Sequence, residues 1–376
     1  MTLQLPAGGT FVGRAWRPDI GPAVVVRRGD HLVDITSSKV PTMQALLELD
    51  DPAGFANGAE GPVLGALEDV AKPSADGLRL MAPCDLQPVK ACGVTFVSSM
   101  LERVIEEQAK GDPARAEAIR ERCTAILGES LRAVQPGSEK AGQLKDVLIA
   151  DGVWSQYLEV GIGPYAEVFS KAQPMSAVGF GAEVGLHPVS TWNNPEPEIV
   201  LACDSTGRVR GATLGNDVNL RDVEGRSALL LGKAKDNNAS CAVGPMLRLF
   251  DDSYGIDDVR QAELTLTVTG EDGYVLNGRS SMSQISRDPL DLVSQTFGAH
   301  HQYPDGFFLM LGTLFAPTED RDHPGEGFTH KLGDVVEISE PSLGLLRNTV
   351  RLSTECAPWV FGTSALMRNL AGRGLL

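Results

Sequence analysis

Two glutamates flank a proline directly before an apolar run, in the segment WNNPEPEIVLACDSTGRVRGATLGND at residues 192–217. Side chains two residues apart in an extended chain point to the same face, so Glu196 and Glu198 are expected to lie side by side. Two neighbouring carboxylates repel each other unless a cationic side chain or a metal ion lies between them. Pro195 and Pro197 stiffen the backbone and remove two N–H donors, which fixes the direction of Glu196.

The same segment predicts a β-hairpin that supplies a third carboxylate. We expect strands at 198–203 and 208–216, paired so that Glu196 lies opposite Gly215. Asp217 then lies at the same end of the hairpin as the glutamates and on the same face. Three hard oxygen ligands with open positions suit Mg²⁺ or Mn²⁺, and Ca²⁺ less well. The alternative is that these are ordinary exposed acids at strand ends and that Asp217 only caps the turn that follows.

The elements that must position these acids begin with a β-rich region. Residues 10–36 carry β-hairpin signals with a Gly-Asp turn, a short helix is expected at TMQALLEL (42–49), and a Pro- and Gly-rich connector follows at 52–83. We therefore expect a small β-rich N-terminal domain at 1–83 and a second domain at 84–376.

A helical segment of about 50 residues is expected at 99–150, because apolar residues such as Val104 recur at helical spacing. Pro113 can occupy the first position of a second helix, whose period continues to Leu127. From residue 153 onward, short apolar strands alternate with turns, and helices are expected only near 221–235 and 289–299. The fold class is therefore α+β, mostly β.

Composition excludes several classes of protein. The chain has 376 residues and a net charge of −16, so binding to nucleic acid or to an anionic membrane surface is not expected. The N-terminal segment lacks the pattern of a signal peptide, and no apolar run of about 18 residues could span a bilayer. The six cysteines form no CxxC pair, which favours free thiols in a reducing cytoplasm.

The order of motifs resembles the fumarylacetoacetate hydrolase superfamily over about residues 86–365. The matching features are the E-x-E pair, an aspartate followed by RD, the lysine in AKDNNASC, the loop FFLMLGTLFAP, and the segment AEVFSKAQP. The resemblance implies a mixed β-sandwich roll with a small β-rich N-terminal domain, and a homodimer or homotetramer. It also implies that Glu196, Glu198 and Asp217 bind Mg²⁺ (or Mn²⁺), and that Lys235 and Thr313 contact the substrate.

One departure from the family pattern bears on the reaction. Hydrolase members carry G-x-N-Y-x-x-H-x-x-E, whose His–Glu pair activates water, whereas the matching stretch here is GVTFVSSMLE. Ser99 stands at the histidine position and Glu102 keeps the glutamate. Without imidazole, no obvious base of near-neutral pKa is left to activate water. S-x-x-E before an apolar helical run is also a capping box, so both residues could instead cap a helix.

The variant resembles the branch that dehydrates 2-keto-3-deoxypentonate to 2-oxoglutarate semialdehyde in oxidative pentose catabolism. Its partner would be a small-molecule 2-keto acid, with Glu102 and Lys235 in acid–base roles beside Ser99. The candidate substrate-binding residues are Thr313, Arg287, Lys171, Ser98 and Gln173. Ordinary alternatives are a solvated lysine, a strand threonine, and a salt bridge between Arg287 and Asp288.

Two other functions remain open. The first is a hydrolase of the same fold that cleaves a C–C bond in an acylpyruvate or diketo acid. The second is a non-catalytic relative that binds a metabolite. His300 and His301 could suggest zinc, but without HExxH or a nearby thiolate pair they are expected to be packing or surface residues. The sequence contains no P-loop and no G-x-S-x-G.

Overall fold

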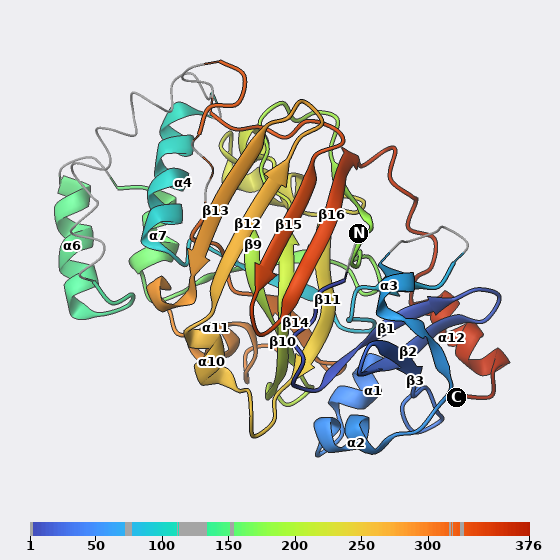
Figure 1. The fold of residues 1–376 in the computed structure, drawn as a ribbon. Coiled ribbons are helices and arrows are strands. Elements are labelled where there is room, and N and C mark those ends of the chain that lie inside the picture. Colours follow the sequence, from blue (N-terminus) through green and yellow to red (C-terminus); the bar gives the residue numbers. More distant parts are fainter. Residues whose placement is uncertain are drawn as a thin grey trace.

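The computed structural model describes residues 3–71, 77–110, 112, 134–150, 154–315, 317, 319–323 and 327–376, apart from the side chain of residue 106. In this part of the chain, eleven strands form one mixed sheet and five form a second (Figure 1). The larger sheet has the order β4-β3-β2-β1-β11-β10-β9-β14-β6-β7, with β5 paired to β1, and the smaller has the order β13-β12-β15-β16-β8. The expected mostly-β, α+β fold class is confirmed.

The strands run over these residues: β1 Phe11–Arg17, β2 Gly21–Arg28, β3 His31–Asp34, β4 Val63–Ala66, β5 Arg79–Met81, β6 Val89–Gly93, β7 Glu167–Ala172, β8 Glu183–Leu186, β9 Pro197–Cys203, β10 Val209–Asp217, β11 Cys241–Leu249, β12 Glu263–Thr269, β13 Val275–Ser281, β14 Phe307–Met310, β15 Val335–Glu340 and β16 Gly344–Leu352. The helices are α1 Met43–Leu47, α2 Pro52–Gly58, α3 Leu67–Val70, α4 Val97–Ala109, α6 Glu139–Ala150, α7 Gln156–Ile162, α8 Arg221–Glu224, α9 Leu231–Lys235, α10 Ile256–Arg260, α11 Pro289–Thr296 and α12 Thr363–Gly372, with 3₁₀ turns η1 Ala228–Leu230 and η2 Met282–Gln284.

The two sheets pack face to face, and their central strands make the contact. β9, β10 and β11 lie against β12, β15 and β16. Strand β12 shows how the sequence directs this packing: Leu264, Leu266 and Val268 are buried, while the residues between them face outward. Period-2 alternation with one apolar face is what a sheet covered on one side requires.

The N-terminal strands continue the larger sheet. β1 pairs antiparallel with β11, with Phe11 opposite Arg248 and Val12 opposite Leu247. The expected Gly-Asp turn joins β2 to β3 at residues 29–30, and Gly29 takes a positive φ of 56°. The division into domains at residue 83 stays a prediction.

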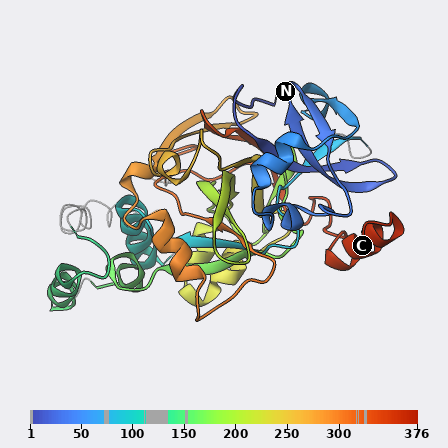
Figure 2. The same cartoon turned by 90° about the horizontal axis from the view of Figure 1, so that it is seen from below.

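The helices gather at separate places around the sheets. α4, α6 and α7 lie together at one side, far from the N-terminal strands and from α12 at the opposite side (Figures 1 and 2). They form their own apolar cluster, which includes Val104, Ile105, Leu148 and Leu158. The expected helix start at Pro113 and its continuation to Leu127 lie outside the described residues.

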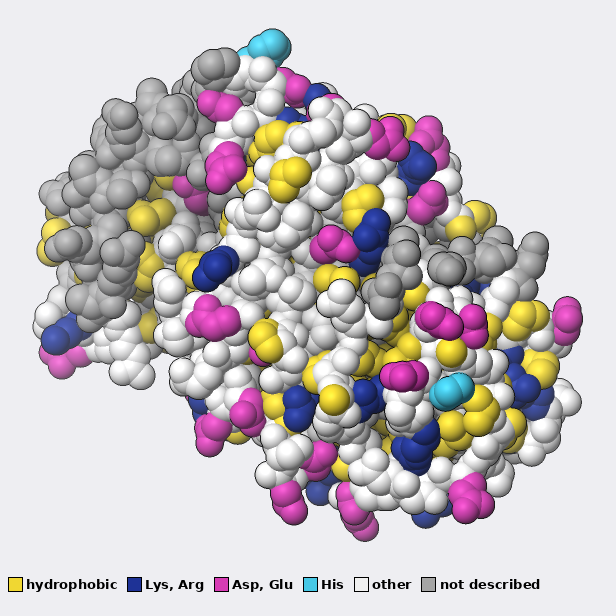
Figure 3. Space-filling view, in the orientation of Figure 1, with side chains coloured by type: hydrophobic (Ala, Val, Ile, Leu, Met, Phe, Trp, Pro, Cys, Tyr) yellow, Lys and Arg dark blue, Asp and Glu magenta, His cyan; other side chains and the backbone are white. Residues whose placement is uncertain are grey.

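The surface carries charges of both signs, and acidic and basic side chains are interspersed on the face in Figure 3. Among the described residues, no helix is long and apolar enough to cross a bilayer. Five cysteines are free and buried, and Cys123 lies outside the described residues.

Candidate active site

The β9–β10 hairpin forms, but its register differs from the expected one by two residues. Glu198, and not Glu196, lies opposite Gly215. The connection after Cys203 is one residue longer than expected, and the register shifts again between Val209 and Gly211. Because a shift of two residues keeps every side chain on its original face, the glutamates still share a face with Asp217.

Glu196, Glu198 and Asp217 meet at the end of this hairpin. One carboxylate oxygen of each lies within 4.8 Å of the others, and all three residues are buried. The backbone N–H of Asp217 donates to the carbonyl of Glu196 at 3.0 Å, which places these two residues directly opposite each other. The predicted convergence is therefore present, while the role of the three residues as metal ligands stays a prediction.

Two buried lysines hold Asp217 from either side. The Nζ atom of Lys235, at the end of α9, lies 3.0 Å from Asp217 Oδ2 and 2.5 Å from Glu196 Oε2. The Nζ atom of Lys171, on β7, lies 2.7 Å from Asp217 Oδ1 and donates to the carbonyls of Val218 and Lys235. Burial alone would raise the pKa of Asp217, but the two ammonium groups hold it below its ordinary value. Lys171 therefore fixes Asp217 and the backbone of Lys235.

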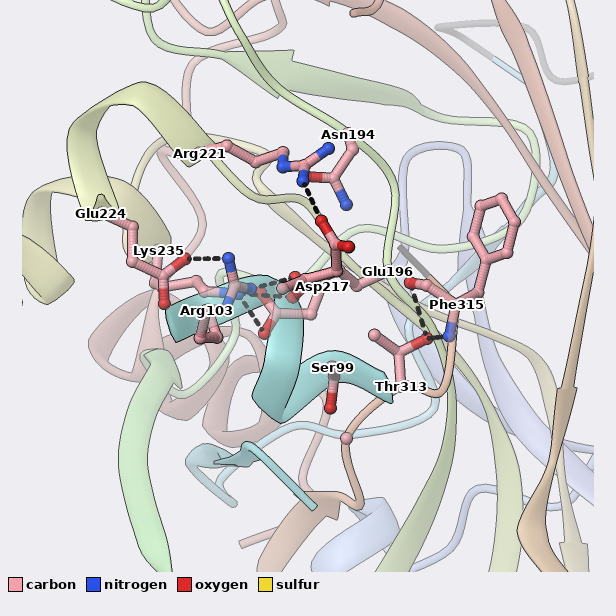
Figure 4. A network of polar contacts seen from close by, with 12 residues as sticks. Ser99, Arg103, Asn194, Glu196, Asp217, Arg221, Glu224, Lys235, Thr313 and Phe315 are labelled. Carbon is pink, nitrogen blue, oxygen red and sulfur yellow. Dashed lines mark hydrogen bonds and ion pairs between the residues drawn. The ribbon is translucent and has the colours of Figure 1, made fainter. Parts of the chain in front are cut away.

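Arginines from two helices complete the network (Figure 4). On α4, the Nη2 atom of Arg103 lies 2.5 Å from Glu196 Oε1, and its Nη1 atom lies 3.0 Å from Glu224 Oε2. On α8, Arg221 binds Glu102 at 3.3 Å and donates to the carbonyl of Pro317 at 2.9 Å. Its guanidinium also lies over the ring of Trp192, 4.3 Å from the centroid.

The carboxylate of Glu198 is held by a backbone N–H group. Its Oε2 atom accepts a hydrogen bond from the N–H of Gly312 at 2.6 Å. Gly312 has a φ of 92°, and a Cβ at this position would lie 2.0 Å from the hydroxyl of Thr95, so only glycine suits this close approach. Burial, together with the neighbouring charges of Asp217 and Glu196, raises the pKa of Glu198 well above its ordinary value.

The structure adds a carboxyl group that the sequence reasoning missed. Glu167 begins β7 and lies opposite Gly93 on β6, where a Cβ would meet Glu167 Oε2 at 2.0 Å. Burial first, and then the charge of Glu224, raise the pKa of Glu167 to about 7. The signal was present in AEVFSKA, because Glu167 lies four residues before Lys171 on the same face of one strand.

The donor set fits a divalent cation. The described network contains six carboxylates and four cationic side chains: Glu102, Glu167, Glu196, Glu198, Asp217 and Glu224, with Arg103, Lys171, Arg221 and Lys235. If all are ionised, the described network holds an excess of two negative charges. Glu198 lies beside the charges of Asp217 and Glu196, which a cation bound to the three acids would offset.

The capping-box interpretation of Ser99 and Glu102 is wrong. Helix α4 begins at Val97, so Ser99 lies inside the first turn and its hydroxyl donates to the carbonyl of Phe96 at 2.9 Å. Glu102 forms an ion pair with Arg221, and because the helix begins at Val97, Ser99 is not the N-cap residue that a capping box requires. Ser99 is buried on α4 one turn before Arg103, which makes contact with Glu196.

The remaining candidates differ in their distance from the network. Thr313 directly follows Gly312, and its hydroxyl accepts from the N–H of Phe315 at 3.1 Å. Gln173 donates to the carboxylate of Asp236, next to Lys235, at 3.3 Å. Ser98 is exposed on α4.

Arg287 is occupied elsewhere. It donates to the carbonyls of Val160 and Gly163 at 3.0 and 2.6 Å and lies 3.7 Å from Asp291. The expected salt bridge between Arg287 and Asp288 is wrong, because Asp288 binds Arg260 at 2.6 Å. His300 and His301 are exposed and take no part in the described network.

Comparison with known proteins supports the resemblance stated above. Residues 178–351 match the family described as "Fumarylacetoacetate (FAA) hydrolase C-terminal". The chain is 30% identical over 194 residues to a probable 2-keto-3-deoxyxylonate dehydratase of Haloferax volcanii, covering 52% of this chain and 63% of the relative. It is 30% identical over 185 residues to a 2-dehydro-3-deoxy-D-arabinonate dehydratase of Saccharolobus solfataricus, covering 49% and 58%. The match thus spans about 60% of the length of each relative.

Solved structures share the fold over most of the chain. A 2-keto-3-deoxy-D-arabinonate dehydratase in its apo form superposes with a TM-score of 0.64 at 20% identity, covering 91% of this chain and 99% of the other. The structure of that enzyme complexed with magnesium and 2,5-dioxopentanoate gives 0.63 at 20% identity, with the same coverage. A fumarylacetoacetate hydrolase from Exiguobacterium antarcticum gives 0.53 at 16% identity, covering 91% and 99%.

Proposed function

Because residues 178–351 match the fumarylacetoacetate hydrolase C-terminal family, we propose that this chain is a hydro-lyase that removes water from a 2-keto-3-deoxy sugar acid. The substrate class is a 2-keto-3-deoxypentonate and the product is 2-oxoglutarate semialdehyde, also called 2,5-dioxopentanoate. The observation that carries the proposal is the buried group of three acids beside a near-neutral carboxyl group and a serine where hydrolases have histidine. The names of the two similar dehydratases support the same reaction class.

Glu196, Glu198 and Asp217 would hold the cation, which we propose to be Mg²⁺, or Mn²⁺ in its place. When bound, such an ion acts as a Lewis acid that makes the C3 protons of a 2-keto acid more acidic. The protein supplies the positions of its ligands: the N–H of Gly312 fixes Glu198, and Lys171 fixes Asp217. The solved relative that contains magnesium supports this assignment.

Proton transfer needs a group that can change its charge near neutral pH. Glu167 is suited to this task, because burial and the charge of Glu224 raise its pKa to about 7. We propose that Glu167 takes the C3 proton and then returns a proton to the C4 hydroxyl, which leaves as water. A proton shift from C5 completes the conversion to the semialdehyde. Glu102 stays a second acid–base candidate, and its pairing with Arg221 makes it the weaker one.

Lys235 remains protonated in this scheme. Although burial lowers the pKa of a lysine, the charges of Asp217 and Glu196 raise the pKa of Lys235 above its ordinary value. It therefore serves as a fixed positive charge that faces the reacting oxygens, rather than as a base. Thr313, on the loop after β14, and Ser99, on helix α4, are proposed to contact the substrate.

The test is an incubation of the purified protein with Mg²⁺ and a panel of 2-keto-3-deoxyaldonates. The expected result is consumption of a 2-keto-3-deoxypentonate with formation of one semialdehyde per molecule and no release of pyruvate. Pyruvate in stoichiometric yield from these substrates would show retro-aldol cleavage in place of dehydration, whereas pyruvate released from an acylpyruvate would establish the C–C hydrolase alternative. An inert protein that still binds the acid would establish the non-catalytic alternative. Light scattering of the same sample tests the proposed homodimer or homotetramer.

A further inference from the structure

Arg103 is the cation of the described network that a ligand from solvent can reach. Its side chain is 13% exposed, whereas those of Lys235 and Lys171 are 3% and 0% exposed. It lies on α4 in the turn that follows Ser99, and its guanidinium joins Glu196 on one side to Glu224 on the other. Arg103 therefore links the group of acids to Glu224 (Figure 4).

The contacts of Glu196 conflict with its role as a metal ligand. Its Oε1 atom binds Arg103 and its Oε2 atom binds Lys235, both at 2.5 Å. A cation that is coordinated by Glu196 binds one of these oxygens and repels the positively charged group that already contacts it. Lys235 is the less free to move, because it is buried and also binds Asp217. Arg103 is thus the group that gives way.

An arginine released from Glu196 does not lose its anchor. Glu224, on α8, still binds the Nη1 atom of Arg103 at 3.0 Å, so the guanidinium keeps its place at the edge of the site. A guanidinium offers paired donors in a planar fork, which matches the geometry of a carboxylate. The 2-keto acid of the proposed reaction brings such a carboxylate to the cation.

We propose that Arg103 exchanges partners when the site is loaded: it releases Glu196 to the divalent cation and binds the carboxylate of the incoming 2-keto acid, while Glu224 keeps it in place. This rests on the proposed function for the identity of the ligand. It makes Arg103 a determinant of specificity for acids over their neutral analogues, a role that the sequence motifs do not assign.

The experiment compares two probes that do not undergo the reaction, pyruvate and pyruvamide, by calorimetry on the Mg²⁺-loaded protein. Arg103→Met is expected to weaken pyruvate binding roughly 10- to 100-fold, as the loss of a charge-assisted pair does, and to leave pyruvamide binding unchanged. The pyruvate affinity of Arg103→Lys is expected to lie between those of the wild type and Arg103→Met, because lysine keeps the positive charge but lacks the paired donors of a guanidinium. Arg208→Met replaces an exposed arginine on the β9–β10 turn whose partner, the buried Asp204, keeps its ion pair with Arg210; it is the matched control and should bind like the wild type.

A second measurement distinguishes this role from one in which Arg103 only holds Glu196 and Glu224 in place. Mn²⁺ binding, followed by electron paramagnetic resonance, should be unchanged or tighter in Arg103→Met, because a competitor for Glu196 has gone. The proposal is overturned if the variant loses Mn²⁺ and both probes equally, or if pyruvate binding does not change. Should Arg103→Met fail to fold, the same comparison in Arg103→Lys decides. A wild-type protein that binds neither probe with Mg²⁺ would overturn the proposed function as well, whereas Arg103-dependent pyruvate binding without turnover would overturn that function alone.

Discussion

The Nζ atom of Lys235 lies 2.5 Å from the Oε2 atom of Glu196, and both side chains are buried. Removing the ammonium in Lys235→Met leaves Glu196 and Asp217 facing each other without it. We expect the variant to lose about 3–5 kcal/mol of stability in EDTA, as the breaking of a buried ion pair typically does. Turnover should fall to background. Thermal unfolding and the dehydratase assay measure the two effects.

The response of Lys235→Met to Mg²⁺ tests whether the three acids bind the metal. Because a divalent cation can replace the lost positive charge, added Mg²⁺ should raise the melting temperature of Lys235→Met more than that of the wild type. Lys145→Met, which removes an exposed lysine paired with Glu159, is the control and should change little. An equal response to Mg²⁺ in all three proteins would contradict the assignment of the three acids as ligands.

Glu167→Gln tests the near-neutral carboxyl group. We expect turnover to fall roughly 10²–10⁴-fold, the usual contribution of general acid–base catalysis. In the wild type, the rate should rise with pH around 7, because Glu167 must be ionised to accept the C3 proton. That rise should be absent from the residual activity of the variant.

The same substitution has an opposite effect on stability. A carboxyl group whose pKa is raised by folding binds more protons in the native state, so its contribution to stability falls as pH rises from its unfolded value to about 7. Glutamine remains neutral at every pH. Metal-free Glu167→Gln should therefore melt higher than the wild type at pH 8 and at nearly the same temperature near pH 4. A lower melting temperature at pH 8 would place the Glu167 charge in a favourable pair instead.

Gly312→Ala tests how Glu198 is positioned. The new Cβ would lie 2.0 Å from the Thr95 hydroxyl at a φ of 92°, so the loop must move and take its N–H away from Glu198. We expect a loss of about 1–3 kcal/mol and at least a ~10-fold fall in Mg²⁺ affinity, measured by calorimetry. Gly58→Ala is the control, because its Cβ would meet nothing within 4 Å and its φ is ordinary. Unchanged Mg²⁺ binding in Gly312→Ala would show that this N–H does not position a ligand.

Acid sensitivity should arise from Asp334, which is buried and binds Arg321 at 2.6 Å and His330 at 3.0 Å. Although burial opposes ionisation, hydrogen bonds from these two residues lower the pKa of Asp334 to about 2. Its contribution is therefore complete above the unfolded pKa of about 4 and is lost as pH falls through about 2.

Asp334→Asn is expected to be less stable at pH 7 by about 3 kcal/mol and to show a weaker pH dependence below pH 4, in urea unfolding. Asp257→Asn changes an acid that is 91% exposed and should stay within about 0.5 kcal/mol of the wild type. If both variants followed the wild-type pH curve, Asp334 would not be the acid-labile group.

The group of three acids could be predicted because it depends on a local rule. Glu196 and Glu198 share a face through the period of a strand, and Asp217 joins them through a hairpin whose turn is short. The predicted register of the hairpin was wrong by two residues, because the sequence does not indicate the longer turn or the irregularity beside Val209. That error did not matter for the site, since an even shift leaves each side chain on its face.

Partners that are distant in sequence could not be predicted in the same way. Glu167 faces the site because β7 pairs with β6, which lies more than 70 residues earlier in the chain. Arg103 reaches Glu196 only because α4 packs beside the end of the hairpin. Neither the β6–β7 pairing nor the contact between α4 and the hairpin leaves a periodic signal in the sequence. Both are seen only in the folded structure.

The pairing of β1 with β11 has a consequence for how the chain can be divided. All nine residues of β11 are buried, and on the edge that β10 does not cover, β1 pairs with Leu247 and Arg248 while Val178 pairs with Ala242. A fragment that began near residue 84 would leave the edge at Leu247 and Arg248 without its partner strand, and such unpaired N–H and C=O groups can recruit strands from other molecules. The N-terminal strands thus protect this edge from pairing with other molecules. The site at the other end of β11 depends on them, because it needs a sheet that does not self-associate.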